Sequence, residues 1–228
     1  MNNNRITVLI LFILIVCFSI SFAQEGQDVK CVKTSEIGSS IICLPEIIEM
    51  NECYELPNVK ERMDKFEVGD NSILGVYLTD DIYSNIENFE TIFIDEYFKI
   101  YLVNNTKDKT YGTSELEQIG DIMENNFIAD NWDNLRKQVE EKNDELTIGV
   151  PVIIESYTPD ENVKSFLMLT KISNIEAEKV MLMSMNILLI KEKIIWLGYY
   201  KLYVNEDSIQ KIRSANDSVV MKLIEVNK

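Results

Sequence analysis

The chain of 228 residues contains no histidine. Histidine is the general base of Ser-His-Asp and Cys-His hydrolases, and it is the commonest protein ligand for zinc, copper and iron. Its absence excludes those catalytic sets, the HExxH zinc sites and every histidine-ligated metal centre. Any catalysis would depend on carboxylates, tyrosines or lysines whose pKa values are tuned by burial.

Glycine is also scarce. The eight glycines never approach the spacing of a GxGxxG or GxxxxGK[ST] phosphate-binding loop. No ladder of Asp and Asn around a central glycine resembles an EF-hand calcium loop. The sequence therefore predicts no cofactor and no metal site.

Basic residues are few beside acidic ones, with 22 Lys and Arg against 38 Asp and Glu and a formal charge of −16. A field of this sign repels phosphate backbones and anionic lipid head groups, so nucleic acid and acidic membrane surfaces are poor partners. The expected partner is an unknown protein or a small ligand. The negative charge would favour basic proteins or cations, and the alternative is a soluble, self-repelling surface with no such role.

The first 23 residues have the three regions of a secretory signal peptide. Arg5 supplies the positive region, residues 6–20 form an apolar run, and Ser21-Phe22-Ala23 resembles a cleavage site. We expect cleavage after Ala23, export to the periplasm or the extracellular space, and no stable membrane insertion of the mature chain. An uncleaved anchor is the alternative, because the apolar run is near the lower limit for spanning a bilayer.

The rest of the chain divides into an arm and one domain. Residues 24–39 are polar and lack periodicity, which predicts a flexible N-terminal arm. Residues 40–228 contain no repeat, no low-complexity linker and no shift in composition. These features indicate a single α/β domain.

The segment around which this domain is organised covers residues 180–203. Two apolar runs flank Lys191-Glu192-Lys193, and this arrangement is typical of a β-hairpin. Both faces of the two predicted strands are apolar, so both need helices over them. Short turns between the other predicted strands favour antiparallel pairing. The sequence thus predicts an α/β (α+β) fold, a three-layer sandwich with a mainly antiparallel sheet and helices on both faces.

The end of the chain also resembles a known family. The stretch MNILLIKEKIIWLGYYKLY, then NED and a helix closing on LIEVNK, resembles the closing unit of PsbP-like α/β sandwich proteins. The earlier segments ICLPE, SILGVYLTD and YFKIYLV are similar in order to uncharacterised exported bacterial proteins of that kind. The resemblance implies a three-layer fold often used as a non-catalytic accessory or binding module. It is a pattern of strands, so no functional residue is carried over.

Three cysteines would remain in the mature chain: Cys31, Cys43 and Cys53. An exported protein tends to oxidise a suitable pair, and an odd number leaves one cysteine over. Cys31 lies in the predicted arm, whereas Cys43 lies in a predicted strand and Cys53 follows soon after it. We therefore predict a Cys43–Cys53 disulfide.

Glu155 is the carboxylate most suited to catalysis, because it interrupts the apolar run VPVIIESY. A desolvated carboxyl group there could serve as a general acid. The alternatives are an ion pair with Lys171 or Lys201, or a strand end that faces solvent. Glycoside chemistry also needs a second converging carboxylate, and the sequence shows none.

Four aromatic residues gather in or beside the second strand of the hairpin: Trp196, Tyr199, Tyr200 and Tyr203. Such side chains combine a large contact area with polar tips, so they are candidates for an interaction surface. The alternative is packing within the sheet. The sequence therefore predicts an exported, non-catalytic binding or accessory protein of the cell envelope or extracellular space. A carboxylate-dependent hydrolase using Glu155 is the alternative function.

Overall fold

The predicted hairpin forms the centre of the sheet. The computed structural model describes residues 29–67, 69–89, 93–125, 127–141, 147–173 and 178–228, so the expected signal peptide lies outside the described residues. β9 (Glu178–Ile190) pairs antiparallel with β10 (Lys193–Leu202). Lys191 and Glu192 form the turn between them with φ angles of 47° and 60°. Two consecutive positive φ angles are the geometry of a two-residue turn that matches the right-handed twist of the strands.

The strands around this hairpin build an eight-stranded sheet in the order β3-β4-β5-β10-β9-β8-β6, with β7 also paired to β8. Every strand pair in the described chain is antiparallel. The other strands are β1 (Cys31–Ile37), β2 (Ser40–Pro45), β3 (Met50–Glu52), β4 (Asn71–Thr79), β5 (Glu96–Val103), β6 (Thr147–Ile148), β7 (Val152–Tyr157) and β8 (Val163–Ser173).

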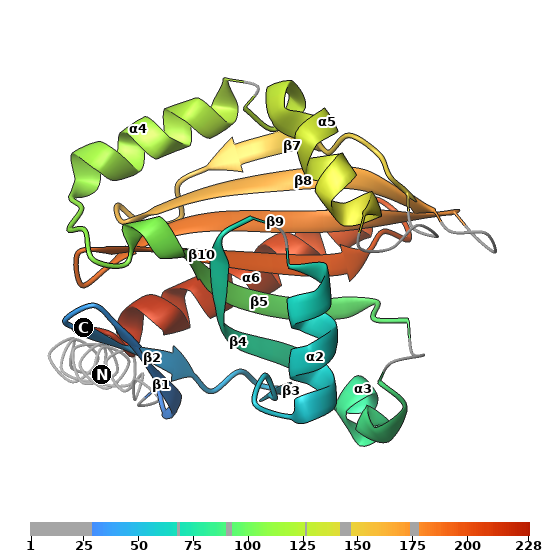
Figure 1. Ribbon diagram of the computed structural model, residues 1–228, viewed down its shortest axis with the longest axis horizontal. Coiled ribbons are helices and arrows are strands. Elements are labelled where there is room, and N and C mark those ends of the chain that lie inside the picture. The colour runs from blue at the N-terminus through green and yellow to red at the C-terminus, as the bar shows by residue number, and fades with distance from the viewer. Residues whose placement is uncertain (1–28, 68, 90–92, 126, 142–146, 174–177) are drawn as a thin grey trace, which may run out of the picture.

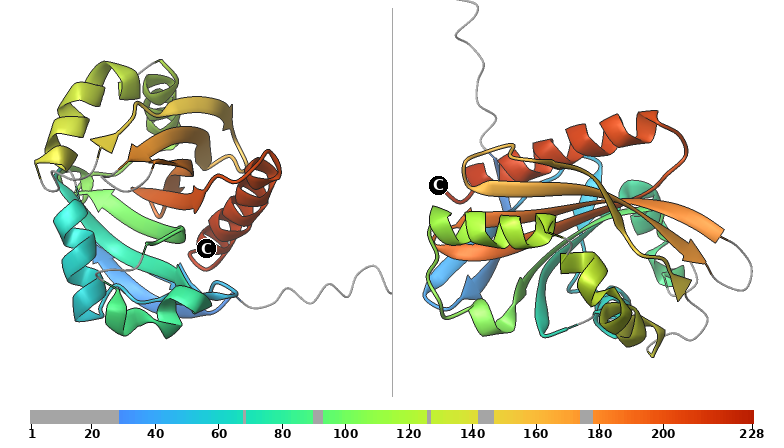
Figure 2. Two further views of the ribbon diagram at one scale, coloured as in Figure 1. Left: turned by 90° about the vertical axis from the view of Figure 1, so that its right-hand side faces the viewer. Right: turned by 90° about the horizontal axis from the view of Figure 1, so that it is seen from above.

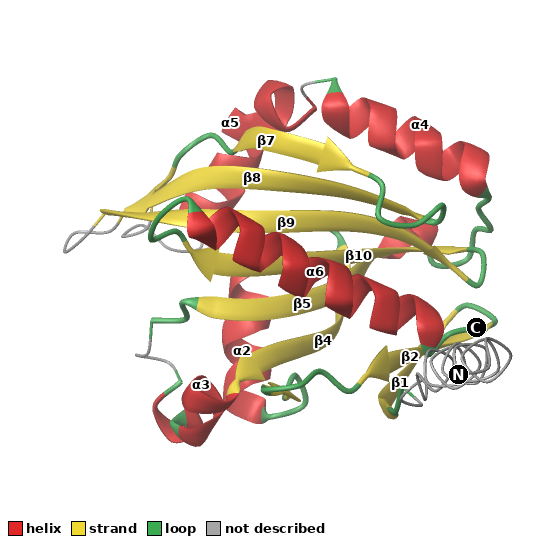
Figure 3. Cartoon of the chain, turned by 180° about the vertical axis from the view of Figure 1, so that it is seen from behind, coloured by secondary structure: helices red, strands yellow, loops and turns green. Residues whose placement is uncertain are grey.

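Helices cover both faces of the sheet, as the sequence predicts (Figures 1 and 2). The α-helices are α2 (Pro57–Phe66), α3 (Asp80–Ser84), α4 (Thr113–Glu124), α5 (Phe127–Glu140) and α6 (Asp207–Glu225). The short 3-10 helices are η1 (Ile86–Asn88) and η2 (Asn104–Thr106). Figure 3 shows α6 crossing one face alone, whereas α2, α4 and α5 lie on the other. The three-layer α+β sandwich is therefore confirmed.

One core lies between α6 and the sheet. Val219, Val220 and Leu223 of α6 pack on the inward side chains of β9 and β10, such as Leu188 and Leu197. Apolar residues spaced three and four apart put these side chains on one stripe of the helix. This core holds α6 firmly to the face that it covers.

The opposite face has two separate cores. Val59 and Met63 of α2 pack over Val76 of β4. The other core lies between the α4–α5 pair and strands β8, β9 and β10, and includes Leu116, Trp132, Phe166, Ile187 and Ile194. The central strands β5 and β10 run between these two groups of helices (Figure 1).

The N-terminal arm is ordered where the structure describes it, and the prediction of a flexible arm over residues 24–39 is wrong for Cys31–Ile37. These residues form β1, which pairs antiparallel with β2. The β1–β2 hairpin lies beside the β9–β10 turn, where Lys191 Nζ donates to the carbonyl oxygen of Ile41 at 2.9 Å. Lys193 Nζ donates to the carbonyl oxygens of Lys107 and Lys109 at 2.9 and 2.7 Å. The polar sequence of residues 24–39 did not indicate a strand, because a strand in a two-stranded ribbon needs to bury only one face.

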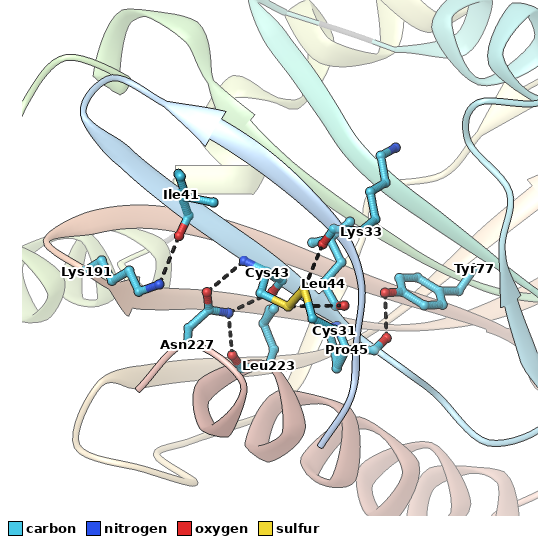
Figure 4. Close-up of a disulfide and its surroundings, with 10 residues drawn as sticks. All are labelled: Cys31, Lys33, Ile41, Cys43, Leu44, Pro45, Tyr77, Lys191, Leu223 and Asn227. Atoms are coloured by element: carbon cyan, nitrogen blue, oxygen red, sulfur yellow. Dashed lines mark hydrogen bonds between the residues drawn. A yellow bond between two sulfur atoms is a disulfide. The ribbon is translucent and has the colours of Figure 1, made fainter. Parts of the chain in front are cut away.

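The disulfide also differs from the predicted one: Cys31 pairs with Cys43, with a Cα–Cα distance of 5.6 Å (Figure 4). Pairing of β1 with β2 places these cysteines on neighbouring strands. Cys53 is instead buried beside β4, where its thiol donates to the carbonyl oxygen of Val76 at 3.5 Å. Asn227 joins the C-terminus to the same hairpin by bonding both the N–H and the carbonyl of Cys43 at 2.8 Å.

Candidate functional site

The alternation of β10 divides the four predicted aromatic residues between the two faces of the sheet. Tyr199 belongs to the core beneath α6, is 1% exposed, and stacks on Phe98 with ring centroids 3.8 Å apart. Its hydroxyl donates to the carboxylate of Glu96. Tyr203, just after β10, is half-buried against the same core. Tyr199 is therefore a core residue, and its prediction as an interaction residue is wrong.

Trp196 and Tyr200 point to the opposite face, where β5 supplies two further aromatic residues. The β5–β10 register pairs Tyr200 with Tyr97 and Trp196 with Tyr101. The Tyr97 and Tyr200 rings are nearly parallel, with centroids 4.5 Å apart, and those of Tyr101 and Trp196 are 6.2 Å apart. These four side chains are called the aromatic strip below. Cross-strand aromatic pairs of this kind stabilise a sheet while they fix the direction of each ring.

Gly198 makes the position of Tyr200 possible. A Cβ atom at Gly198 would lie 2.8 Å from the Tyr200 hydroxyl oxygen and from one of its ring carbons. The Tyr200 side chain thus lies back over the strand, toward Trp196. Only glycine at position 198 leaves room for this arrangement.

An ion pair lies among the aromatic side chains. Lys99 Nζ, also on β5, is 2.6 Å from a carboxylate oxygen of Glu67, which follows α2, and both side chains are largely buried. The same Nζ lies 4.9 Å from the centroid of the Tyr101 ring. Burial alone would lower the pKa of Lys99, but the neighbouring Tyr200 and Glu67 outweigh it and the net direction is upward. Lys99 therefore remains a cation at neutral pH.

The hydroxyl groups of Tyr97 and Tyr101 are uncharged at neutral pH. Burial, followed by the nearby Tyr200 and Glu67, raises the pKa of both residues well above its usual value. A neutral phenol both donates and accepts hydrogen bonds. Both side chains consequently stay neutral over a physiological range of pH.

Helices flank the strip on both sides. Tyr97 packs against the core beneath α2, and Trp196 packs against the core beneath α4 and α5. The two groups of helices are joined where the Gly69 N–H, after α2, donates to Gln138 Oε1 of α5 at 3.2 Å. Tyr97, Trp196 and Tyr200 keep partial exposure between them.

Glu155 lies elsewhere, on the edge strand β7. Its carboxylate accepts a bond from Arg213 of α6 at 2.5 Å, and both side chains are partly exposed. Neither Lys171 nor Lys201 pairs with it, since Lys171 pairs with Glu178 and Lys201 with Glu96. This surface ion pair gives no support to a general acid at Glu155.

Two other kinds of feature can be checked within the ranges that the structure describes. These residues include no group of three or more Cys, Asp or Glu side chains that could hold a metal ion. No helix among them has the length and apolar character needed to cross a membrane. What the described chain does bring together is a set of aromatic side chains around an ion pair.

Sequence reasoning missed Tyr97, Lys99, Tyr101 and Glu67. The signal for three of them was present, because YFKIYLV places Tyr97, Lys99 and Tyr101 on one face of a strand by simple alternation. The sequence did not show which strand pairs with this one. The β5–β10 pairing joins segments almost a hundred residues apart, and nothing local specifies it.

Comparison with known proteins adds little. No family model matches the sequence, and no curated protein matches it. Among solved structures, the chain is similar to the Ran-binding protein Mog1p of Saccharomyces cerevisiae, at 11% identity over 86% of this chain and 92% of that one. The TM-score is 0.32, and a likeness at this level carries no argument about function.

Proposed function

We propose that this protein is an exported, non-catalytic binding protein whose aromatic strip receives an apolar segment of a basic protein partner. The observation that carries the proposal is the convergence of Tyr97, Tyr101, Trp196 and Tyr200 on the central strands, between two groups of helices. Tyrosine and tryptophan are among the residues most enriched at the positions that dominate binding energy at protein interfaces.

The geometry of the strip favours a protein segment over a sugar. Tyr97 and Tyr200 cover one another's ring faces, and Trp196 lies nearly parallel to Tyr101. The stacked Tyr97 and Tyr200 rings then have one face fewer available to a ligand. Apolar side chains pack against ring edges, and neutral hydroxyls bond to the peptide groups between them.

Charge supports the choice of a basic partner. The formal charge of −16 produces a negative field that accelerates encounter with a positive protein. This attraction weakens as salt rises, because exposed charges are screened.

Export and an accessory role are parts of the same proposal. The features of residues 1–23 support export, and the Cys31–Cys43 disulfide suits an oxidising compartment. The segments that resemble the closing unit of PsbP-like proteins correspond to β9, β10 and α6, so the resemblance supports an accessory role. The proposed location is the cell envelope or the extracellular space.

The test is site-specific capture of the partner. A photo-crosslinking amino acid replaces Tyr200 in the exported chain, and a control replaces Tyr83, which is 41% exposed on α3. Each protein is illuminated in the native host. We expect position 200 to capture a partner that position 83 does not. Capture of the same proteins at both positions would contradict the proposal.

The captured partner then permits a measurement of affinity. The chain has two tryptophans, so a Trp132→Phe background makes Trp196 the sole fluorescent tryptophan. We expect Trp196 emission to change on binding and Tyr97→Ala to weaken binding about tenfold or more. Unchanged affinity in folded Tyr97→Ala would remove the strip from the proposal. Turnover of glycans or esters that disappears in Glu155→Gln would instead establish the hydrolase alternative.

A further inference from the structure

The corner between α4 and α5 exposes two large apolar side chains. Ile122 near the end of α4 is 52% exposed, and Phe127 at the start of α5 is 43% exposed. Leu116 and Met123 supply the buried stripe of α4, so Ile122 is not needed for its packing. Apolar side chains that gather on one surface indicate an interaction site more often than single ones do.

A shallow hollow of about 300 Å³ lies between these side chains, lined also by Asp121, Asn125, Asp130 and Asn131. Asn125 Nδ2 donates to the carbonyl oxygen of Asp121 at 2.7 Å, and Asn131 Nδ2 donates to that of Phe127 at 2.8 Å. Within the described chain, the Asp121 and Asp130 carboxylates have no ion-pair partner, and both residues are exposed. The rim of the hollow therefore carries two exposed carboxylates that no cation of the described chain pairs with.

The helix on one side of the hollow is acidic. α4 contains Glu115, Glu117, Asp121 and Glu124 and no Lys or Arg, and of these Glu117 pairs with Lys164 of β8. A second copy of this chain would bring the same carboxylates against one another, and like charges at close range oppose association. A segment with Lys or Arg beside an apolar side chain can pair with the carboxylates and also pack against the exposed apolar side chains of the hollow.

We propose that the α4–α5 corner is a second docking site, which binds a basic amphipathic helix of a protein partner. An apolar side chain of that helix packs between Ile122 and Phe127, and Lys or Arg one turn away on either side pairs with Asp121 and Asp130. Residues three or four apart lie on the same face of a helix, so one helix meets both requirements. The site is independent of the aromatic strip.

The test uses defined probes. A fluorescein-labelled helical peptide with Leu and Lys alternating at helical spacing is titrated by anisotropy into the exported chain. One control peptide has Glu in place of every Lys, and another has Ser in place of every Leu. We expect clear binding of the Leu-Lys peptide and about tenfold weaker binding, or none, of either control.

Protein variants locate the site. Ile122→Asn and Phe127→Ser should each weaken binding about tenfold. Asp121→Asn, alone and with Asp130→Asn, should weaken it and flatten its dependence on salt. Controls on α6, at the opposite face, match the chemistry: Met221→Ser removes an apolar side chain that is 41% exposed, and Glu225→Gln removes an exposed charge.

The outcomes distinguish a docking site from non-specific attraction of the basic peptide to the acidic protein. If Met221→Ser or Glu225→Gln weakens binding as much as the corner variants, the peptide follows overall charge and the inference is wrong. Unchanged affinity in Ile122→Asn and Phe127→Ser also overturns it. Circular dichroism confirms that each variant is folded. Loss of Trp196 or Tyr97 should leave binding of this peptide unchanged, which distinguishes this site from the aromatic strip.

Discussion

At the scale of single residues, a buried amide network joins α6 to the sheet. Asn186 Oδ1 accepts from Ser165 Oγ at 2.6 Å and from Asn216 Nδ2 at 2.9 Å. Asn186 Nδ2 donates to Asn216 Oδ1 at 2.7 Å and to the carbonyl oxygen of Leu197 at 3.0 Å. Asn186 and Asn216 are fully buried, so their polar atoms depend on partners within the protein. The network specifies one position of α6 on an otherwise apolar core.

Asn186→Ala should be strongly destabilising. It removes the hydrogen-bond partner of Ser165 Oγ and of Asn216 Oδ1 in an apolar layer, and the expected loss is about 3 kcal/mol. Urea unfolding followed by circular dichroism measures it. The exposed Asn205→Ala, just before α6, should change the free energy of unfolding by less than about 0.5 kcal/mol. Equal values for the two variants would contradict the role of the network.

Gly198 provides a way to disturb the aromatic strip without removing any aromatic residue. In Gly198→Ala the new methyl group forces Tyr200 away from its position, so partner affinity should fall about tenfold. Gly149→Ala is the matched control, because its Cβ would meet no atom closer than the Lys171 Cβ at 3.4 Å. Fluorescence titration with the captured partner measures both. Wild-type affinity in Gly198→Ala would show that the orientation of Tyr200 is unimportant.

At the scale of elements, the β1–β2 hairpin depends on attachments far from it in sequence. Gly38 forms its turn at a φ of 57°, and a Cβ there would lie 2.8 Å from the carbonyl oxygen of Lys107. Asn227 and Lys191 bind the hairpin from the end of the chain after α6 and from the β9–β10 turn. The Cys31–Cys43 disulfide closes a sequence separation of 12 residues, which by chain entropy is worth about 3 kcal/mol.

The cysteines give a direct check of this hairpin. Peptide mapping without reduction should find Cys31 joined to Cys43 and leave Cys53 free. Burial, followed by the charge of Glu52, raises the pKa of the Cys53 thiol to about 12, so almost no thiolate exists at neutral pH. A thiol reagent should therefore label no cysteine in the native mature protein and one in guanidinium chloride. Fast labelling of the native protein would show that Cys53 is not buried as described.

At the scale of the whole molecule, the titrating groups predict stability at neutral pH and loss of it in alkali. No histidine titrates between pH 6 and 8. Six tyrosines have a pKa raised chiefly by burial: Tyr54, Tyr77, Tyr97, Tyr101, Tyr157 and Tyr199. Unfolding releases them to ionise near their usual pKa of about 10. Above that pH the unfolded chain binds fewer protons than the folded one, so stability falls as pH rises.

The free energy of unfolding should thus be nearly flat from pH 6 to 8 and should fall steeply above about pH 10. Tyr77 and Tyr199, each 1% exposed, would together contribute a slope of about 3 kcal/mol per pH unit. Urea unfolding at a series of pH values measures the slope, and tyrosinate absorbance should rise together with loss of circular dichroism. Ionisation of all ten tyrosines near their usual pKa in a folded protein would contradict this prediction.

Local patterns were sufficient for much of this molecule. Alternation of apolar residues on both faces of residues 180–203 predicted strands covered on both sides, and β9 and β10 have that arrangement because uncovered apolar faces are unfavourable in water. The absence of histidine excluded whole classes of site by composition alone. Such conclusions depend only on residue type and short-range spacing.

The tertiary structure decided which strands are neighbours. The positions of most candidate site residues depend on this pairing. Tyr199 became core and Tyr200 became part of the aromatic strip because α6 covers one face of β10 and β5 brings its tyrosines to the other. Cys43 pairs with Cys31 instead of Cys53 because β1, whose polar sequence predicted a loose arm, pairs with β2. Alternation along a strand is a local property, whereas strand neighbours are selected by burial summed over the whole chain.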